Sequence, residues 1–296
     1  MRIRKYSFYI LLAISVVSYF VAQDVVPAVT SVKDGGILTV AFLDVGQGDA
    51  IYIEAPNGHQ MIVDGGPDGS VMQELAKIMP IGDKTIDTIV ITNPDKDHIA
   101  GFMNIMNSFE IYSVLEPGTY NDTKIYKDIE DAIIKEGSKK IIARKGIEIN
   151  LDEKNGVVFS ILFPDKDVSD WKSNPGSVIG KLYYGSRSFL LTGDTVIDIE
   201  NYLVASNGSN LDVDVLKLAH HGSKTSSSQE LLQTASPLYA VISAGQDNKY
   251  GHPHQEVLNR LAGDNIPYLL TARDGTIVFT TDGENLEIKK SVSSAD

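Results

Sequence analysis

The sequence predicts an α/β fold in which two β-sheets pack together and helices cover their outer faces. Each half of the chain opens with short strands joined by tight turns and then alternates strands with helices. A layout that occurs twice favours two sheets packed against each other. The polar groups best suited to chemistry also follow strands directly, which is where layered α/β folds build their sites.

The composition is that of a globular protein and excludes several kinds of site. Hydrophobic residues make up 43% of the 296 residues and charged residues 22%, which is ordinary for a chain that can bury a sizeable core. The net charge of −13 argues against broad, sequence-independent binding of duplex nucleic acid, but it leaves open a nucleic acid held through metal ions. The absence of cysteine excludes disulfides, thiolate metal ligands and cysteine nucleophiles.

The N-terminus has the charge order of a secretory signal or a membrane anchor. Arg2, Arg4 and Lys5 precede an apolar run over residues 6–22, which is close to the lower length limit of a spanning helix. We expect an uncleaved anchor in the cytoplasmic membrane because the cleavage sites are poor, with secretion or a buried helix as alternatives. The chain then divides into a signal or anchor (1–28), a linker (29–35), one domain (36–290) and a tail (291–296), with the domain outside the cytoplasm.

The first part of the domain reads as a β-meander. Strands are expected over 37–45, 50–54 and 60–63. Between the first two lies Gly46-Gln47-Gly48-Asp49, which superficially resembles a dinucleotide-binding glycine loop. Because that motif needs a helix next and residues 50–54 alternate like a strand, the glycines indicate a hairpin turn.

The remaining elements follow from periodicity and turn residues. Further strands are expected over 86–92, 111–115, 141–143, 147–151, 157–163, 178–184, 188–191, 213–219, 238–243, 268–271 and 276–281. Helices are expected over 71–79, 99–109, 124–136, 195–205, 229–235 and 251–261.

The strand that ends at Thr92 runs into the most polar loop of the chain. Asn93, Asp95, Asp97 and His98 lie within six positions. Two carboxylates so close repel each other unless a positive group lies between them. Carboxylate and imidazole are common ligands of divalent metals, so the loop predicts a metal site. A helix N-cap at Asp97 is the alternative, but it explains only one of the four residues.

Three more groups follow strands in the same way. Asp64 precedes two glycines, Asp194 follows Thr-Gly, and His220-His221 ends an apolar strand. Asp64 is expected either to hold its turn or to support a metal ligand from outside. A helix N-cap is the alternative for Asp194, and a structural role is the alternative for the two histidines.

The remaining histidines carry weaker predictions. His252 and His254 bracket a proline at the start of a helix, where a surface position and a substrate contact are equally compatible with the sequence. His59 lies in a turn and is expected to be solvated.

Six segments together resemble a known family. The match is to the metallo-β-lactamase-like domain at the C-terminus of competence proteins of the ComEC/Rec2 type, and it covers about residues 36–285. The resemblance implies an αββα four-layer sandwich with the metal site at the rim between the sheets. It also implies a hydrolase fed by metal-bound hydroxide, and in this branch a nuclease or phosphodiesterase. The matching segments are Phe42–Ala50, Asp64–Pro67, Asn93–Gly101, Leu191–Asp194, His220–Ser223 and Tyr250–His254.

The resemblance also assigns ligands. Asp97 and His98 resemble the ligands of one metal, Asp194 the carboxylate that bridges two metals, and His220 or His221 the late histidine ligand. Asn93 and Asp95 occupy the other metal position, where this branch usually has histidine and aspartate. No histidine lies between residues 98 and 220, so the histidine ligand common there in the wider superfamily is missing. One or two divalent ions are therefore expected, with manganese competing with zinc for oxygen-rich ligands.

The expected function is a metal-dependent hydrolase of a phosphodiester, with nucleic acid as a candidate substrate. Asp95 or Asp97 would orient the attacking water, and His252 or Ser223 would hold a phosphate oxygen. A binding module that kept the fold and lost turnover is the alternative, motivated by Asn93, and a lactone or lactam hydrolase is a third. The resemblance does not extend to the membrane channel of the competence proteins, so we do not expect these 296 residues to import DNA alone. The sequence does not indicate an oligomeric state.

Overall fold

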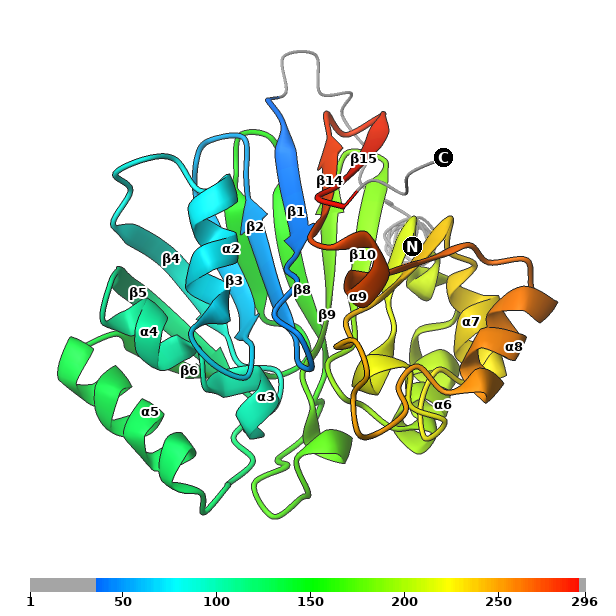
Figure 1. The fold of residues 1–296 in the computed structure, drawn as a ribbon, viewed down its shortest axis with the longest axis horizontal. Coiled ribbons are helices and arrows are strands. Elements are labelled where there is room, and N and C mark those ends of the chain that lie inside the picture. The colour runs from blue at the N-terminus through cyan, green and yellow to red at the C-terminus, as the bar shows by residue number, and fades with distance from the viewer. Residues whose placement is uncertain (1–35, 293–296) are drawn as a thin grey trace, which may run out of the picture. The chain divides into compact units, whose positions relative to one another are not determined.

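The computed structural model describes residues 36–292, which form two β-sheets (Figure 1). The eight-stranded sheet has the order β15 (Leu286–Lys290), β14 (Ile277–Thr281), β1 (Leu38–Phe42), β2 (Ala50–Glu54), β3 (Gln60–Gly65), β4 (Thr85–Val90), β5 (Glu110–Glu116) and β6 (Lys139–Ile142). The seven-stranded sheet has the order β13 (Tyr268–Leu270), β12 (Tyr239–Ile242), β11 (Val215–Lys217), β10 (Arg187–Leu191), β9 (Ile179–Tyr184), β8 (Val157–Phe163) and β7 (Glu148–Asp152).

The two sheets repeat one plan, as the sequence predicts. In the first sheet, β1 to β3 pair antiparallel and β3 to β6 pair parallel. In the second, β7 to β10 pair antiparallel and β10 to β13 pair parallel. Antiparallel neighbours need only short turns, whereas parallel neighbours need crossovers, and this accounts for the switch from turns to helices in each half.

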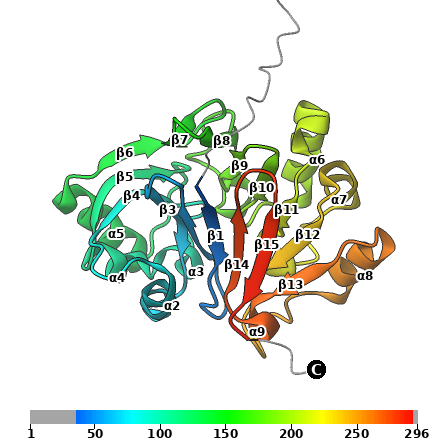
Figure 2. The ribbon, with the colours of Figure 1, turned by 90° about the horizontal axis from the view of Figure 1, so that it is seen from above.

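Three apolar layers hold the fold together and confirm the αββα sandwich. Alternate residues of β1 face opposite layers: Leu38, Val40 and Phe42 lie between the sheets, and Ala41 belongs to the outer layer. The outer layer of the first sheet is covered by α2 (Ser70–Ile78), α3 (Lys96–Ile99), α4 (Phe102–Met106) and α5 (Lys124–Glu136). That of the second sheet is covered by α6 (Ile197–Asn207), α7 (Gln229–Ala235) and α8 (Gln255–Gly263), and Figure 2 shows both helix layers outside the sheets.

The helix expected over 99–109 is the main difference from the sequence prediction. It begins earlier, at Lys96, and is broken into α3 and α4. Gly101 lies at the break, where its backbone NH donates to the Gly66 carbonyl at 3.1 Å and an added Cβ would collide with the Gly65 carbonyl. The close approach to the end of β3 requires glycine here, and it places Asp97 and His98 in a helical turn instead of an open loop.

The strand β15 and the helical turn α9 are not among the predicted elements. The edge strand β15 pairs only with β14, and its two apolar residues, Leu286 and Ile288, pack half-buried against the layer between the sheets, which is too short a pattern to predict a strand. The single turn α9 (Thr271–Asp274) follows β13. Within residues 36–292, no helix combines the length and apolar character needed to cross a bilayer, and the expected anchor lies outside the described residues.

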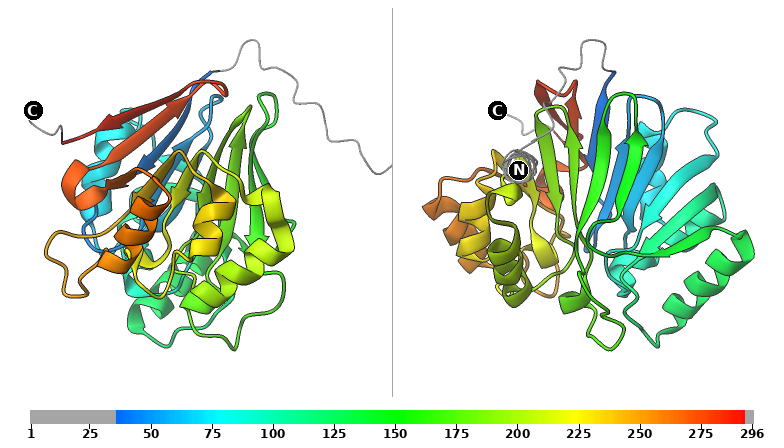
Figure 3. Two further views of the ribbon diagram at one scale, coloured as in Figure 1. Left: turned by 90° about the vertical axis from the view of Figure 1, so that its right-hand side faces the viewer. Right: turned by 180° about the vertical axis from the view of Figure 1, so that it is seen from behind.

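The strand ends that carry polar groups gather at one edge of the sandwich. β3, β4 and β5 run parallel, as do β10, β11 and β12, so their carboxyl ends share a rim in each sheet. The loops that follow them lie at the lower edge of both sheets in Figure 1, and the views in Figure 3 agree. This rim brings together groups that are far apart in sequence.

Candidate metal centre

Two histidines from different sheets meet at the rim. His98 lies on α3 after β4, and His221 lies in the short 3-10 segment Ala219–Gly222 after β11; both side chains are buried. His220 and His221 both have left-handed backbone angles, with φ of 51° and 56°. Such angles are uncommon outside glycine and persist only where surrounding contacts hold them, so the structure is strained to place this histidine pair.

Hydrogen bonds on the far side of each ring define its tautomer. His98 Nδ1 is 2.8 Å from Asp64 Oδ2, and His221 Nδ1 is 2.9 Å from the Ser243 carbonyl. Because these acceptors take the Nδ1 proton, the neutral rings leave Nε2 as an open electron pair. Both Nε2 atoms are buried and have no hydrogen-bond partner among residues 36–292. This is the arrangement by which proteins orient metal-binding imidazoles.

Two carboxylates complete the cluster. Asp194 Oδ2 lies 3.1 Å from His98 Nε2 and 3.7 Å from His221 Nε2, and Asp97 Oδ2 lies 3.3 Å from His221 Nε2. One ligand atom from each of Asp97, His98, Asp194 and His221 falls within 4.8 Å of the other three. Two imidazole nitrogens and two carboxylate oxygens that converge without hydrogen-bond geometry fit a divalent cation between them.

The pKa values report the same need for positive charge. Burial alone would raise the pKa of Asp194, but the His98 and His221 rings hold it well below its usual value. Burial would lower the pKa of His221, but Asp194 and Asp49 raise it to about 10. Burial likewise opposes a proton on His98, yet Asp194 and Asp64 raise its pKa well above 6.5. Ionised carboxylates buried this deeply are stabilised either by protonated rings or by a metal cation bound to the rings. The proton and the metal cation compete for the same imidazole nitrogen atoms.

Asp64 supports the centre from outside, as one of its two sequence interpretations proposed. Its carboxylate accepts from the Thr92 backbone NH at 2.8 Å and from Thr92 Oγ1 at 2.5 Å, in addition to His98.

Close packing of the preceding glycine against Thr92 fixes the position of Asp194. Gly193 before it has φ +52°, and a Cβ there would lie 2.8 Å from Thr92 Oγ1.

A buried ion pair behind His221 was missed by the sequence analysis. Lys217 Nζ lies 2.9 Å from the Asp49 carboxylate, and Asp49 Oδ1 is 3.3 Å from His221 Nδ1. The sequence places Asp49 in a hairpin turn and in the matching segment Phe42–Ala50, but gives it no role. Lys217 itself is the feature of the sequence that indicates an ion pair, because a lysine inside an apolar strand is rarely buried without a partner.

Asn93 and Asp95, predicted as metal ligands, are held by neutral hydrogen bonds. Asn93 Nδ2 donates to Asn174 Oδ1 at 2.9 Å and to Ser177 Oγ at 3.3 Å, and its Oδ1 accepts from the Asp95 backbone at 2.9 Å. Asp95 Oδ1 accepts from Ser173 Oγ at 2.8 Å and from an Asn121 amide at 3.0 Å. The segment that contains Ser173, Asn174 and Ser177 carried no prediction of a contact here, since isolated Ser and Asn residues in a loop give no distinctive signal.

The other predicted residues lie around the cluster. His220 is the more exposed of the pair, with Nε2 4.0 Å from Asp194 Oδ2 and Nδ1 3.1 Å from Thr225 Oγ1, so the geometry favours His221 as the ligand. Ser223 is buried, and its Oγ lies 3.0 Å from Thr225 Oγ1. His59 is exposed in its turn, as expected.

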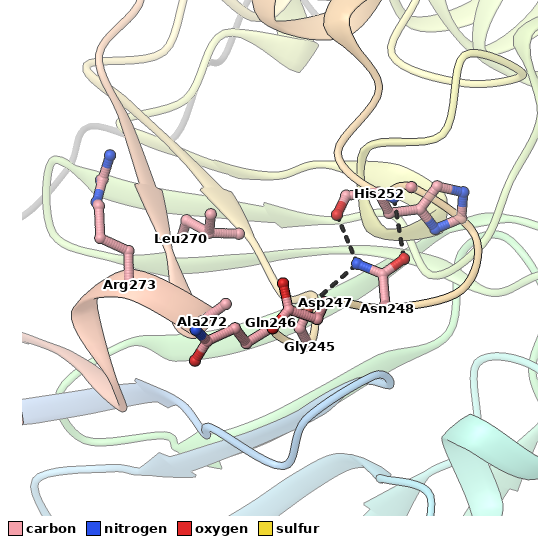
Figure 4. Close-up of a pocket in the computed structure, with 9 residues that line it drawn as sticks. Gly245, Gln246, Asp247, Asn248, His252, Leu270, Ala272 and Arg273 are labelled. Carbon is pink, nitrogen blue, oxygen red and sulfur yellow. Dashed lines mark hydrogen bonds between the residues drawn. The ribbon is translucent and has the colours of Figure 1, made fainter.

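His252 borders the cluster and a pocket. Its ring centroid is 5.5 Å from that of His220 and 6.1 Å from that of His221. Burial, and then the charge of His221, lower its pKa to about 4, so the ring is neutral at physiological pH. Figure 4 shows the adjoining pocket of about 540 Å³. Its lining residues are Gly245, Gln246, Asp247, Asn248, Gly251, His252, Leu270, Ala272 and Arg273.

Comparisons with known proteins agree with the fold and the motifs. A family model of the metallo-beta-lactamase superfamily matches residues 43–246, and the chain belongs to this superfamily. It is similar to ComE operon protein 3 of Bacillus subtilis (29% identical over 257 residues, 81% of this chain and 32% of that protein). It is also similar to the competence protein ComA of Neisseria gonorrhoeae (30% identical over 242 residues, 81% and 32%). The predicted ComEC/Rec2-type resemblance is thus confirmed, and the chain spans about a third of the length of these relatives.

A solved structure supports the fold alone. The diiron beta-hydroxylase CmlA of Streptomyces venezuelae has a TM-score of 0.52 at 13% identity, over 79% of this chain and 52% of that chain.

Proposed function

We infer that the protein is a metal-dependent phosphodiesterase with one divalent ion held by Asp97, His98, Asp194 and His221. The observation that carries this proposal is the pair of buried imidazole Nε2 atoms that have no hydrogen-bond partner in the described residues and face two carboxylates. Isolated buried polar atoms are costly, so a fold that keeps several of them at one point is built around a missing partner.

Each residue has a distinct role in the proposal. A divalent ion, when bound, supplies a water of lowered pKa and polarises the scissile oxygen. The Asp97 side chain is 33% exposed, whereas those of His98, Asp194 and His221 are at most 5% exposed, so Asp97 faces the solvent and orients the attacking water. His252 is neutral and lies beside His221, where its ring donates a hydrogen bond to a phosphate oxygen. Ser223 is buried and engaged with Thr225, so we assign the phosphate contact to His252 in preference to Ser223.

The arrangement favours one ion over two. Both polar ends of Asn93 are used in hydrogen bonds, and Asp95 accepts two neutral donors. These donors satisfy the side-chain oxygen of Asn93 and one of the two carboxylate oxygens of Asp95, Oδ1, which leaves fewer oxygen ligands for a second cation. The remaining set of two nitrogens and two oxygens suits zinc and manganese.

The substrate and location rest on similarity and on the N-terminal segment. One of the relatives is named as a competence protein, which supports a phosphodiester of a nucleic acid as the substrate. The basic residues and apolar run at the N-terminus support action outside the cytoplasm, with residues 6–22 in the membrane or removed on secretion.

Metal content and phosphodiester hydrolysis test the proposal together. We expect about one manganese or zinc ion per chain by elemental analysis, and metal-dependent hydrolysis of bis(p-nitrophenyl) phosphate. His221→Ala should lose both the ion and the hydrolysis, whereas His59→Ala, which removes an exposed histidine in a turn, should keep both. Equal metal content in wild type and His221→Ala would overturn the assignment.

A binding module without turnover is the second candidate, and Asn93 is the residue that favours it. Its hydrogen bonds occupy the place where the family resemblance implies another metal ligand. This candidate predicts one bound ion per chain with no hydrolysis of any phosphodiester under manganese or zinc. The same two measurements therefore separate the candidates.

A further inference from the structure

The rim of the seven-stranded sheet continues beyond the candidate metal centre into the pocket of Figure 4. β12 lies next to β11, which leads to His221, and β13 lies on the far side of β12; all three run parallel. The loop after β12 and the turn α9 after β13 form the walls of the pocket, and His252 lies at the end that adjoins the metal centre. A substrate bound at the metal centre therefore has a cavity beside it.

The wall formed by residues 245–252 is ordered by one side chain. Asn248 Nδ2 donates to the carbonyls of Gly245 at 2.9 Å and His252 at 2.6 Å. Asn248 Oδ1 accepts from the backbone NH groups of His252 at 3.0 Å and Tyr250 at 3.2 Å. Four hydrogen bonds from one amide hold this loop in place without a ligand, which lowers the entropic cost of binding in the pocket.

The pocket has a different chemical character at each end. Leu270 and Ala272 give it an apolar side, and Arg273 lies on α9, away from His252 in Figure 4. The Arg273 side chain is half exposed and is oriented by hydrogen bonds from Nη2 to Asp274 at 2.7 Å and to the Tyr268 carbonyl at 3.0 Å. Nη1 of Arg273 has no hydrogen bond within residues 36–292. A fixed guanidinium with a free donor suits a phosphate oxygen.

The pocket is also flanked by aromatic and acidic groups. The Tyr250 ring is half exposed, stacks on His252 with centroids 5.6 Å apart, and carries Lys249 Nζ at 5.0 Å. His252 and Lys249 already cover this ring, so we do not assign it to the ligand. Asp247 lines the pocket and would repel a phosphate, so the anionic part of a ligand belongs at Arg273 and the base nearer Asp247.

We propose that this pocket binds the nucleotide next to the scissile phosphodiester, with Arg273 on the phosphate of that nucleotide. A nucleic acid strand that crosses the rim would place one phosphate at the metal centre and the next at Arg273. The apolar side formed by Leu270 and Ala272 then faces the base and sugar between them. The proposal rests on the phosphodiesterase function and extends it, because the enzyme would also bind a part of the substrate beyond the bond that it cleaves.

Two variants and two substrates test the proposal. Arg273→Gln removes the charge, and Ala272→Phe fills the pocket without changing charge. Bis(p-nitrophenyl) phosphate reaches only the metal centre, whereas an oligothymidylate also reaches the pocket. We expect Arg273→Gln to lower the ratio of kcat/KM for the oligonucleotide to kcat/KM for the small substrate by roughly tenfold, the worth of one charge-assisted hydrogen bond. Ala272→Phe should lower the same ratio because the ring blocks the pocket.

Arg187→Gln is the matched control. Arg187 also pairs with an aspartate at 2.7 Å, Asp214, but it lies at the start of β10, at the opposite end of the strands. This control should leave the ratio unchanged. If Arg273→Gln and Ala272→Phe leave it unchanged as well, the pocket does not bind the substrate and the proposal is wrong.

A binding measurement separates this proposal from the proposed function. The affinity for a fluorescent oligothymidylate, measured by anisotropy with the metal removed by a chelator so that the strand is not cleaved, should fall by roughly tenfold in Arg273→Gln. It should also fall in Ala272→Phe, where the pocket is blocked. The slope of log affinity against log salt concentration should decrease in magnitude by about one in Arg273→Gln, because one phosphate contact is lost, and should not change in Ala272→Phe. If the wild type hydrolyses neither substrate, the function fails, and the affinities alone decide the pocket: equal affinity in wild type and both variants overturns it.

Discussion

Replacing Lys217 by methionine would leave the Asp49 carboxylate buried without its counter-charge. Both side chains are at most 2% exposed, and Lys217 Nζ lies 2.9 Å from the carboxylate and donates to the Leu218 carbonyl at 2.9 Å. Burial alone would raise the pKa of Asp49, but Lys217 and then His221 lower it to about 2. The carboxylate is therefore ionised in the folded protein, and methionine provides no charge to balance it.

The magnitude follows from the geometry. At a separation of 2.9 Å and an effective dielectric constant of about 20, the two charges attract by about 6 kcal/mol. Desolvation of both groups offsets much of this in the intact pair, but removal of one partner leaves the desolvation of the other uncompensated. We therefore expect Lys217→Met to lower the free energy of unfolding by about 3–5 kcal/mol.

Urea denaturation at neutral pH, followed by circular dichroism, measures the effect. Lys181→Met is the matched control, because Lys181 is also buried but donates only to the carbonyls of Asn210 and Asp212, at 2.8 and 2.7 Å. It should cost about 1–3 kcal/mol. The double variant Lys217→Met/Asp49→Leu removes both charges and should be more stable than Lys217→Met. A Lys217→Met loss no larger than that of Lys181→Met, with no recovery in the double variant, would refute the ion-pair reasoning.

Three further predictions address the centre, the core and the pH dependence. Asp64→Ala removes the acceptor that fixes the His98 tautomer, so metal affinity, measured by chelator competition, should fall by roughly 10–100-fold. Gly180→Ala would force a Cβ into the Phe159 ring, and urea denaturation should show a loss of about 1–3 kcal/mol. Burial and a neighbouring carboxylate raise the pKa of Glu116 to about 7 from 4.5. Between these values only the folded state keeps the proton, so stability should fall as pH rises from 4.5 to 7, by on the order of 2 kcal/mol more than in Glu116→Gln.

Each of these predictions has a control or a contrary outcome. Asp68→Ala removes an exposed carboxylate on the same loop and should leave metal affinity unchanged; an equal loss in both variants would argue against a tautomer effect. Gly263→Ala, at a glycine with open space around it, should be neutral or stabilising. A wild-type protein whose stability rises between pH 4.5 and 7 relative to Glu116→Gln would contradict the raised pKa of Glu116.

The sequence determined the architecture and most of the groups at the candidate metal centre. Strand patterns that switch from tight turns to β/α units in each half predicted two packed sheets, and the structure has two sheets. The predicted groups at strand ends, including Asp97, His98 and Asp194, do meet at one rim. Both successes have a local cause, since hydrophobic periodicity and turn residues act within a few positions of the chain.

Only the tertiary structure decided between alternatives that depend on distant partners. His220 and His221 are equivalent in sequence, and the Ser243 carbonyl and Asp194 distinguish them. Asn93 reads as a weak metal ligand, but Asn174, 81 positions away, accepts from its amide nitrogen and fixes the side chain with its oxygen on the Asp95 backbone NH. The ion pair of Lys217 with Asp49 spans 168 positions. Local pattern specifies which face of an element is buried, but the direction of a polar side chain is set by the groups it meets when the layers pack, and those groups are known only once the chain has folded.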